Sequence, residues 1–122
     1  MKKSKKELKR FLIAGSGAVL TDFVTYYLML NFLSHNIAKT ISFLLGTVVA
    51  FILNKYWTFE NKQKSFKQII QFLFLYMLTL TINIFTNSFV LNITGLVLLS
   101  FVIATGVSTI LNFIGQKWWV FK

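Results

Sequence analysis

The acidic side chain that could do chemistry in the apolar part of this chain is Asp22. It is the only charged residue between Phe11 and Leu33. An ionisable residue in the middle of a membrane helix costs about 2.5 to 3.5 kcal/mol on insertion scales and often marks a proton or substrate site. One interpretation is therefore a proton- or substrate-coupled site. The alternative is a neutral Asp22 that hydrogen-bonds Thr21, Thr25 or a neighbouring helix and serves only packing.

Two basic and aromatic clusters could bind a phosphorylated amphiphile. A lysine can hold a phosphate as a point charge, an amide can bond sugar hydroxyls, and an indole can stack on a sugar face. Aromatic residues and cytoplasmic lysines also occur at the ends of most membrane helices, so the pattern has a purely structural explanation. Each cluster follows an asparagine: Asn54 precedes Lys55 and Trp57, and Asn112 precedes Gln116, Lys117, Trp118 and Trp119.

Polar stripes run along three of the apolar segments. Thr79, Asn83 and Asn87 recur at helical spacing, so they share one face, which we expect to turn away from lipid. Hydrogen bonding between helices explains the stripe as well as ligand binding does. Two further small or polar faces carry Thr47, Ala50 and Asn54, and Thr105, Ser108 and Asn112.

Other kinds of site lack the residues they need. The chain has no cysteine and a single histidine, and it contains no glycine-rich phosphate loop and no cluster of carboxylates. We therefore expect neither a complete active site nor a metal or cofactor.

The composition indicates that these residues are carried by membrane helices. Hydrophobic residues make up 56% of the 122 residues and charged residues only 13%, about half of what is usual for soluble domains. A helix needs about 20 apolar residues to cross the hydrocarbon layer. The sequence predicts an all-α protein with four transmembrane spans, at residues 11–33, 37–57, 68–91 and 96–119, and a basic loop at 60–67.

The basic residues predict the orientation. Placing both termini and the 60–67 loop in the cytoplasm leaves only Lys39 of the 13 basic residues on the other side. We expect Lys39 to snorkel from the end of the second span. The spans are therefore expected to lie in a membrane that borders the cytoplasm.

The two halves of the chain resemble each other. Ser42, Thr47 and Asn54 match Ser100, Thr105 and Asn112 at one offset (112 − 54 = 58). In the earlier spans Asp22 lies opposite Asn83 (83 − 22 = 61). The sequence thus predicts two parallel two-helix repeats. The basic ending follows at a larger offset (117 − 55 = 62), which predicts one extra turn in span four.

Three stretches resemble the GtrA-like family of small four-helix membrane proteins: KRFLIAGSGAVLTDFVTYYLMLNFL, AFILNKYWTFENK and TILNFIGQKWWVFK. The resemblance covers nearly the whole chain. It implies translocation of a polyprenyl-phosphate-linked sugar for cell-surface polysaccharide or teichoic acid glycosylation, with a membrane glycosyltransferase as partner. The site residues it implies are Ala50, Asn54, Thr58, Phe59, Asn112 and Lys117.

Three functions follow as hypotheses, none of them enzymatic. The first is a translocator, or flippase, in which Lys55 and Lys117 capture the phosphate of the lipid-linked sugar. The second is a membrane anchor for the glycosyltransferase. The third is a small multidrug-resistance-like exporter that uses Asp22 as its proton site. Four short helices enclose little volume, so a homodimer or larger homo-oligomer is expected.

Overall fold

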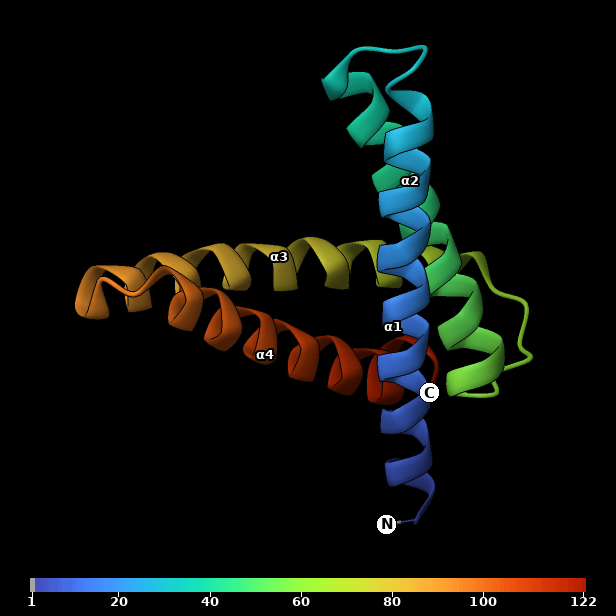
Figure 1. The fold of residues 1–122 in the computed structure, drawn as a ribbon. Coiled ribbons are helices and arrows are strands. Elements are labelled where there is room, and N and C mark those ends of the chain that lie inside the picture. The colour runs from blue at the N-terminus through green and yellow to red at the C-terminus, as the bar shows by residue number, and fades with distance from the viewer. Residues whose placement is uncertain (1) are drawn as a thin grey trace. The chain divides into compact units, whose positions relative to one another are not determined.

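The computed structural model describes residues 2–122, and its regular structure is helical. Within those residues four helices are long and apolar enough to cross a membrane, two of them counted with the π-helical turn that continues them. This confirms the predicted all-α membrane fold. The elements in chain order are α1 (Lys2–Met29), α2 (His35–Leu53), η1 (Asn54–Thr58), α3 (Phe66–Thr94), α4 (Val97–Gly115) and η2 (Gln116–Val120), where η1 and η2 are the π-helical turns (Figure 1).

The chain divides into two compact units, residues 1–63 and 64–122. In the first unit α1 and α2 pack along each other as a helical hairpin, and in the second unit α3 and α4 do the same (Figure 1). Each unit ends in its own π-helical turn, which packs against the first helix of the hairpin. The two-helix repeat expected from the sequence is therefore also the structural unit.

Small residues bring α1 and α2 close together. The buried face of α1 carries Ala14 and Ala18, and that of α2 carries Ala38, Gly46 and Ala50. A methyl group on Gly46 would lie 2.9 Å from the carbonyl oxygen of Ala18. Since lipid offers no hydrophobic drive for helices to associate, such close backbone contact is a main source of attraction between membrane helices.

The second unit repeats the buried pattern of the first. The buried residues of α1 and α3 correspond one to one at an offset of 61 (72 − 11 = 61). They are Glu7, Phe11, Ala14 and Ala18 in α1, and Gln68, Phe72, Leu75 and Thr79 in α3. In α4 the buried residues Ser100, Ala104 and Ser108 again recur every four positions.

The expected extra turn in span four is absent. Helices α2 and α4 each have 19 residues, and each is followed by five residues of π-helix. Between the first and second helices of the units the offset rises by one residue only (62 − 61 = 1), because α3 continues to Thr94, past the position equivalent to Met29 (29 + 61 = 90), and a shorter turn follows. Gly95 then ends α3 with a left-handed φ of 71°. Offsets of 58 and 62 select nearly the same face, since four residues make slightly more than one turn.

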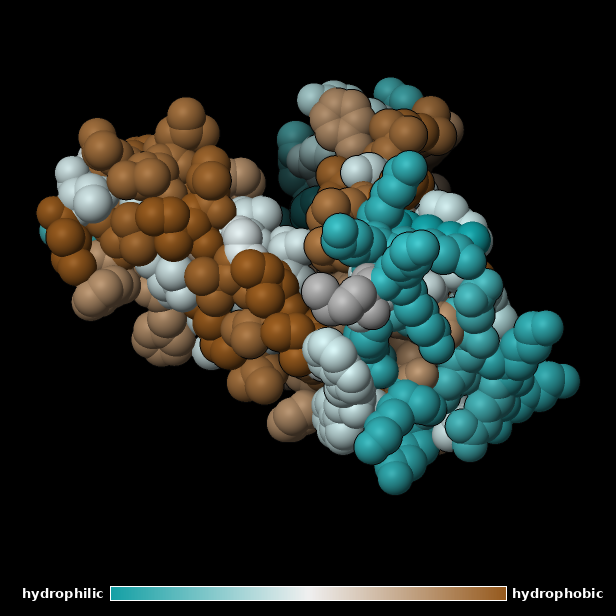
Figure 2. Space-filling model, turned by 90° about the horizontal axis from the view of Figure 1, so that it is seen from below, coloured by the Kyte–Doolittle hydropathy of each residue, from teal (hydrophilic) through white to brown (hydrophobic). Residues whose placement is uncertain are grey.

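Large apolar side chains remain exposed along all four helices. Phe23, Leu44, Phe85 and Phe101 are examples, one from each helix. Brown, apolar side chains cover much of the face in Figure 2. An exposed apolar surface of this extent is suited to contact with lipid.

Candidate functional site

The π-helical turn η1 is held by a buried hydrogen bond. The Thr58 hydroxyl donates to Asn54 Oδ1 at 3.0 Å, and both side chains are buried. The Phe59 backbone N–H donates to the Asn54 carbonyl at 2.9 Å, which ends the turn. Two residues implied by the resemblance, Asn54 and Thr58, are therefore hydrogen-bonded to each other inside the first unit.

The Lys55 side chain is buried within the first unit. Its side chain is 3% exposed, and its ammonium donates to Asn61 Oδ1 at 3.0 Å and to the Gln63 carbonyl. The Tyr56 ring lies 5.5 Å from the ammonium. A lysine directed at loop carbonyls fastens the segment after η1 to the helix end, and phosphate capture would require those contacts to break.

The aromatic residues of the first unit lie against α1. Arg10 donates to the Trp57 carbonyl at 2.8 Å, and its guanidinium lies 5.2 Å from the Trp57 ring. Phe59 is buried, with its ring 6.4 Å from that of Phe11. Ala50 is buried in the helix contact, as its small size suggests. These side chains join the hairpin to its π-helical turn.

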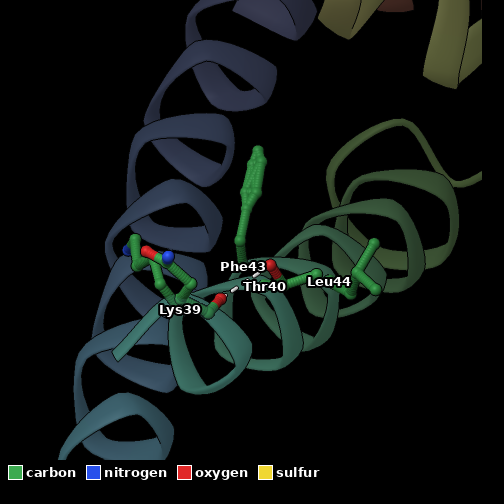
Figure 3. Close-up of a pocket in the computed structure, with 5 residues that line it drawn as sticks. Lys39, Thr40, Phe43 and Leu44 are labelled. Carbon is green, nitrogen blue, oxygen red and sulfur yellow. Dashed lines mark hydrogen bonds between the residues drawn. The ribbon is translucent and has the colours of Figure 1, made fainter. Parts of the chain in front are cut away.

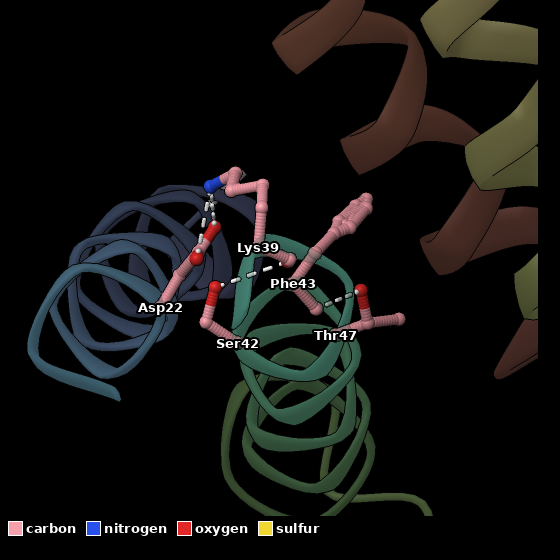
Figure 4. Close-up of polar contacts among 5 residues, drawn as sticks. All are labelled: Asp22, Lys39, Ser42, Phe43 and Thr47. Atoms are coloured by element: carbon pink, nitrogen blue, oxygen red, sulfur yellow. Dashed lines mark hydrogen bonds and ion pairs between the residues drawn. The ribbon is translucent and has the colours of Figure 1, made fainter. Parts of the chain in front are cut away.

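Asp22 and Lys39 form an ion pair between α1 and α2. The Lys39 ammonium lies 2.9 and 3.0 Å from the two carboxylate oxygens (Figure 4). The side chains are 23% exposed for Asp22 and 59% for Lys39. Neither interpretation of Asp22 made from the sequence named Lys39 as its partner. Lys39 was expected to snorkel from the second span, and in the structure its ammonium is paired with Asp22. The pair lies at the end of the unit nearest the turn between α1 and α2.

Next to this pair, α2 carries an open hollow on its outer side. It is lined by Asn36, Lys39, Thr40, Phe43 and Leu44 (Figure 3). The Thr40 hydroxyl donates to the Asn36 carbonyl at 2.8 Å, so its proton is already used within the helix. The hollow is shallow and mostly apolar, and we assign it no ligand.

In the second unit the polar stripe faces the partner helix. Thr79 donates to Asn112 Oδ1 at 3.1 Å, and the Asn83 amide donates to the Ser108 hydroxyl at 2.9 Å. Asn87 is half-buried on the same helix. The expectation that this stripe turns away from lipid fits these contacts. Asn83, which corresponds to Asp22, thus has a neutral partner on α4 in place of a cation.

The last cluster lies on η2. Gln116 is 0% exposed, and neither its amide nitrogen nor its amide oxygen has a hydrogen-bond partner. Lys117 is half-buried, with its ammonium 5.2 Å from the Trp118 ring. Trp119 is exposed and meets Phe74 edge-on, with 6.1 Å between ring centroids.

The candidate residues are divided between the two units of the chain. The first unit holds Asp22, Ala50, Asn54, Lys55, Trp57, Thr58 and Phe59, and the second holds Asn83, Asn112, Gln116, Lys117 and Trp119. Sequence reasoning missed Lys39 as the partner of Asp22. A usable signal was present, because Lys39 is the one basic residue near the far end of span two and Asp22 is the one acidic residue in span one.

The fold and its polar helix contacts define a multi-pass membrane protein built from two repeated helical hairpins. A model of the GtrA/DPMS transmembrane domain matches residues 10–121, so the chain belongs to that family. It is also similar to an uncharacterized membrane protein, YngA, of Bacillus subtilis (strain 168). The two are 32% identical over 123 residues, which cover 99% of this chain and 83% of that protein. At the level of the family, this membership supports a non-catalytic membrane protein involved in glycosyl-lipid translocation.

Proposed function

We propose that this protein is a flippase that moves a polyprenyl-phosphate-linked monosaccharide across the bacterial cytoplasmic membrane, for glycosylation of a cell-surface polysaccharide or teichoic acid. Family membership supplies the class of ligand. The observation that carries the proposal is the polar contact between α3 and α4, where Thr79–Asn112 and Asn83–Ser108 are hydrogen-bonded side chain to side chain.

A sugar crossing hydrocarbon must exchange its water for other hydrogen-bonding groups, because each unpaired hydroxyl is costly there. Hydroxyls and neutral amides can give up one partner and take another without separating charges. The polyprenyl tail stays in lipid, against the exposed apolar faces of the helices. This division of the ligand needs no closed channel for the tail.

Phosphate capture is assigned to Lys117 in this proposal. Lys117 is half-buried in η2, with its ammonium 5.2 Å from the Trp118 ring. An ammonium beside an indole can hold a phosphate while the ring lies along the sugar.

The proposal also includes an orientation in the membrane, a state of assembly and a partner enzyme. Both termini and the 60–67 loop lie in the cytoplasm, where a membrane glycosyltransferase makes the lipid-linked sugar. Two or more copies of the chain assemble, since a single copy offers little enclosed volume. Exposed Lys62, Lys64 and Lys67 are the residues available to meet the enzyme.

Reconstitution in vesicles tests the proposal. Purified protein is inserted in liposomes with polyprenyl-phosphate-glucose, and the sugar in the outer leaflet is oxidised with periodate, which does not cross the bilayer. With active protein, nearly all the lipid is oxidised; without flipping, only the outer-leaflet half reacts. A plateau at half would contradict the flippase and favour the anchor for a glycosyltransferase.

The exporter hypothesis loses its main support. A proton-coupled exporter needs a carboxylate that can alternate between a proton and a cationic drug. Asp22 already pairs with Lys39 through both carboxylate oxygens. We therefore do not propose drug export.

A further inference from the structure

The π-helical turns of the two units are equivalent in geometry. Each has five residues, and each starts on a buried carboxamide, Asn54 in η1 and Gln116 in η2 (116 − 54 = 62). Each is ended by a phenylalanine N–H that donates to the carbonyl of that amide residue, at 2.9 Å for Phe59 and 2.8 Å for Phe121. The two carboxamides therefore hold the same place in their units.

Their side chains differ in one respect. The partner of Asn54 is Thr58, four positions on, and the residue four positions after Gln116 is Val120. Valine has nearly the shape of threonine but no hydroxyl to donate. Val120 thus gives the Gln116 Oε1 no donor of the kind that Thr58 gives Asn54, and Gln116 is buried with both Oε1 and Nε2 unpaired.

The unpaired Gln116 amide can be satisfied only by a partner that both accepts and donates hydrogen bonds. It offers N–H donors and a carbonyl acceptor at one place. A phosphate could take only the donors and would leave the carbonyl unpaired. A hydroxyl group can accept from the N–H and donate to the carbonyl, so vicinal sugar hydroxyls satisfy both atoms. A π-helical turn is also a frequent feature of functional sites in helices.

We propose that Gln116 is the sugar-binding residue of this protein. The second unit has Val120 where the first has Thr58, so the Gln116 amide stays available to a ligand, whereas the Asn54 amide oxygen is already bonded within its own unit. This inference rests on the proposed function for the class of ligand. A hydroxyl of the sugar reaches the amide when the side chains around η2 part. The Gln116 amide has no hydrogen-bond partner while these side chains are packed together, which makes their separation less costly.

Two substitutions at η2 test the proposal from opposite directions. Val120→Thr restores the donor found in the first unit and should pair Gln116 Oε1 internally. Gln116→Leu removes the whole amide while keeping the volume similar. Both should raise the melting temperature of the protein without ligand, because each removes a buried unpaired group. Val102→Thr is the matched control, since it makes the same chemical change at an exposed position of α4.

Ligand binding is read as the shift in melting temperature on adding polyprenyl-phosphate-glucose or bare polyprenyl phosphate. For the wild type and Val102→Thr, we expect the sugar lipid to bind about threefold to tenfold more tightly than the bare lipid, as one or two net hydrogen bonds provide. For Gln116→Leu the two lipids should bind alike, and for Val120→Thr the preference for the sugar lipid should be reduced, because the new hydroxyl occupies Oε1 and leaves Nε2 available.

A preference for the sugar lipid that persists unchanged in both η2 variants would overturn the inference, and so would a wild type that binds the two lipids equally. Sugar-dependent binding that needs Gln116, in a protein that shows no flipping in vesicles, would support the inference while refuting the flippase. The two proposals therefore fail by separate measurements.

Discussion

Replacing Gly46 by alanine should destabilise the α1–α2 hairpin. The added methyl group would lie 2.9 Å from the Ala18 carbonyl oxygen and 3.2 Å from Asp22 Cβ. The nearest of these atoms belongs to the backbone, so no side-chain rotation relieves the contact and the two helices must move apart. Gly15, on α1 of the same unit, is the matched control, because a methyl group there meets nothing within 4 Å.

The size of the effect follows from two opposed terms. Alanine is better than glycine within a helix by about 0.5 to 1 kcal/mol. Overpacking of a close contact costs about 1 to 3 kcal/mol. The net expectation for Gly46→Ala is a loss of about 1 to 2 kcal/mol in the free energy of unfolding, whereas Gly15→Ala should be unchanged or gain up to about 1 kcal/mol.

Unfolding in mild detergent, titrated with sodium dodecyl sulfate and followed by helical circular dichroism, measures both variants against the wild type. A Gly46→Ala protein as stable as Gly15→Ala would refute the close helix contact. A Gly15→Ala protein that lost as much stability would refute the claim that this loss is specific to the buried face.

Two further predictions concern the ion pair and the orientation. The free energy of unfolding of Asp22→Asn, Lys39→Gln and the double variant gives the coupling energy of the pair. We expect about 0.5 to 1 kcal/mol, the modest level of partly exposed pairs. If the losses of the two single variants simply add in the double variant, the pair contributes nothing. The chain has no cysteine, so Lys64→Cys and Phe32→Cys each introduce one labelling site. A maleimide that cannot cross the membrane, added to intact cells, should label position 32 and leave position 64 unlabelled. The reverse pattern would show that the proposed topology is inverted.

The sequence predicted the fold because the bilayer leaves few choices. Apolar runs of membrane length can only be helices, and the stripe of Thr79 and Asn83 had to face another helix. The hydrogen bonds from these residues to Asn112 and Ser108 agree with that reasoning. Such predictions depend on periodicity and solvent alone, so they hold without knowledge of the tertiary contacts.

The environment of the individual charges could not be predicted in the same way. Lys55 resembles any lysine at the cytoplasmic end of a span, and only the path of residues 59–65 brings Asn61 and the Gln63 carbonyl to its ammonium. Lys39 has a long side chain, so its sequence position left both a snorkelling position and a pair with Asp22 open. Tertiary contacts decide between such alternatives.

The length of the repeat was misjudged for a different reason. Identical residues align α2 with α4 at an offset of 58, whereas the ends of these helices correspond at 62 (97 − 35 = 62). Small buried residues recur every four positions in both helices, as at Ser42, Gly46 and Ala50. A shift of four residues therefore leaves the packing face almost unchanged, and identities alone cannot distinguish a longer helix from a shifted register.

The two units differ most in their polar contacts, and the kind of difference has a consequence for transport. The first unit joins its helices by an ion pair, Asp22–Lys39, whereas the second joins α3 and α4 by neutral groups such as Asn83 and Ser108. Separating the ion pair leaves two charges unpaired, whereas an amide and a hydroxyl can each take a sugar hydroxyl as a substitute. Contacts that a ligand can replace one at a time lower the barrier to its passage. If the protein acts as the flippase proposed above, the polar residues of the second unit should therefore govern the rate of flipping.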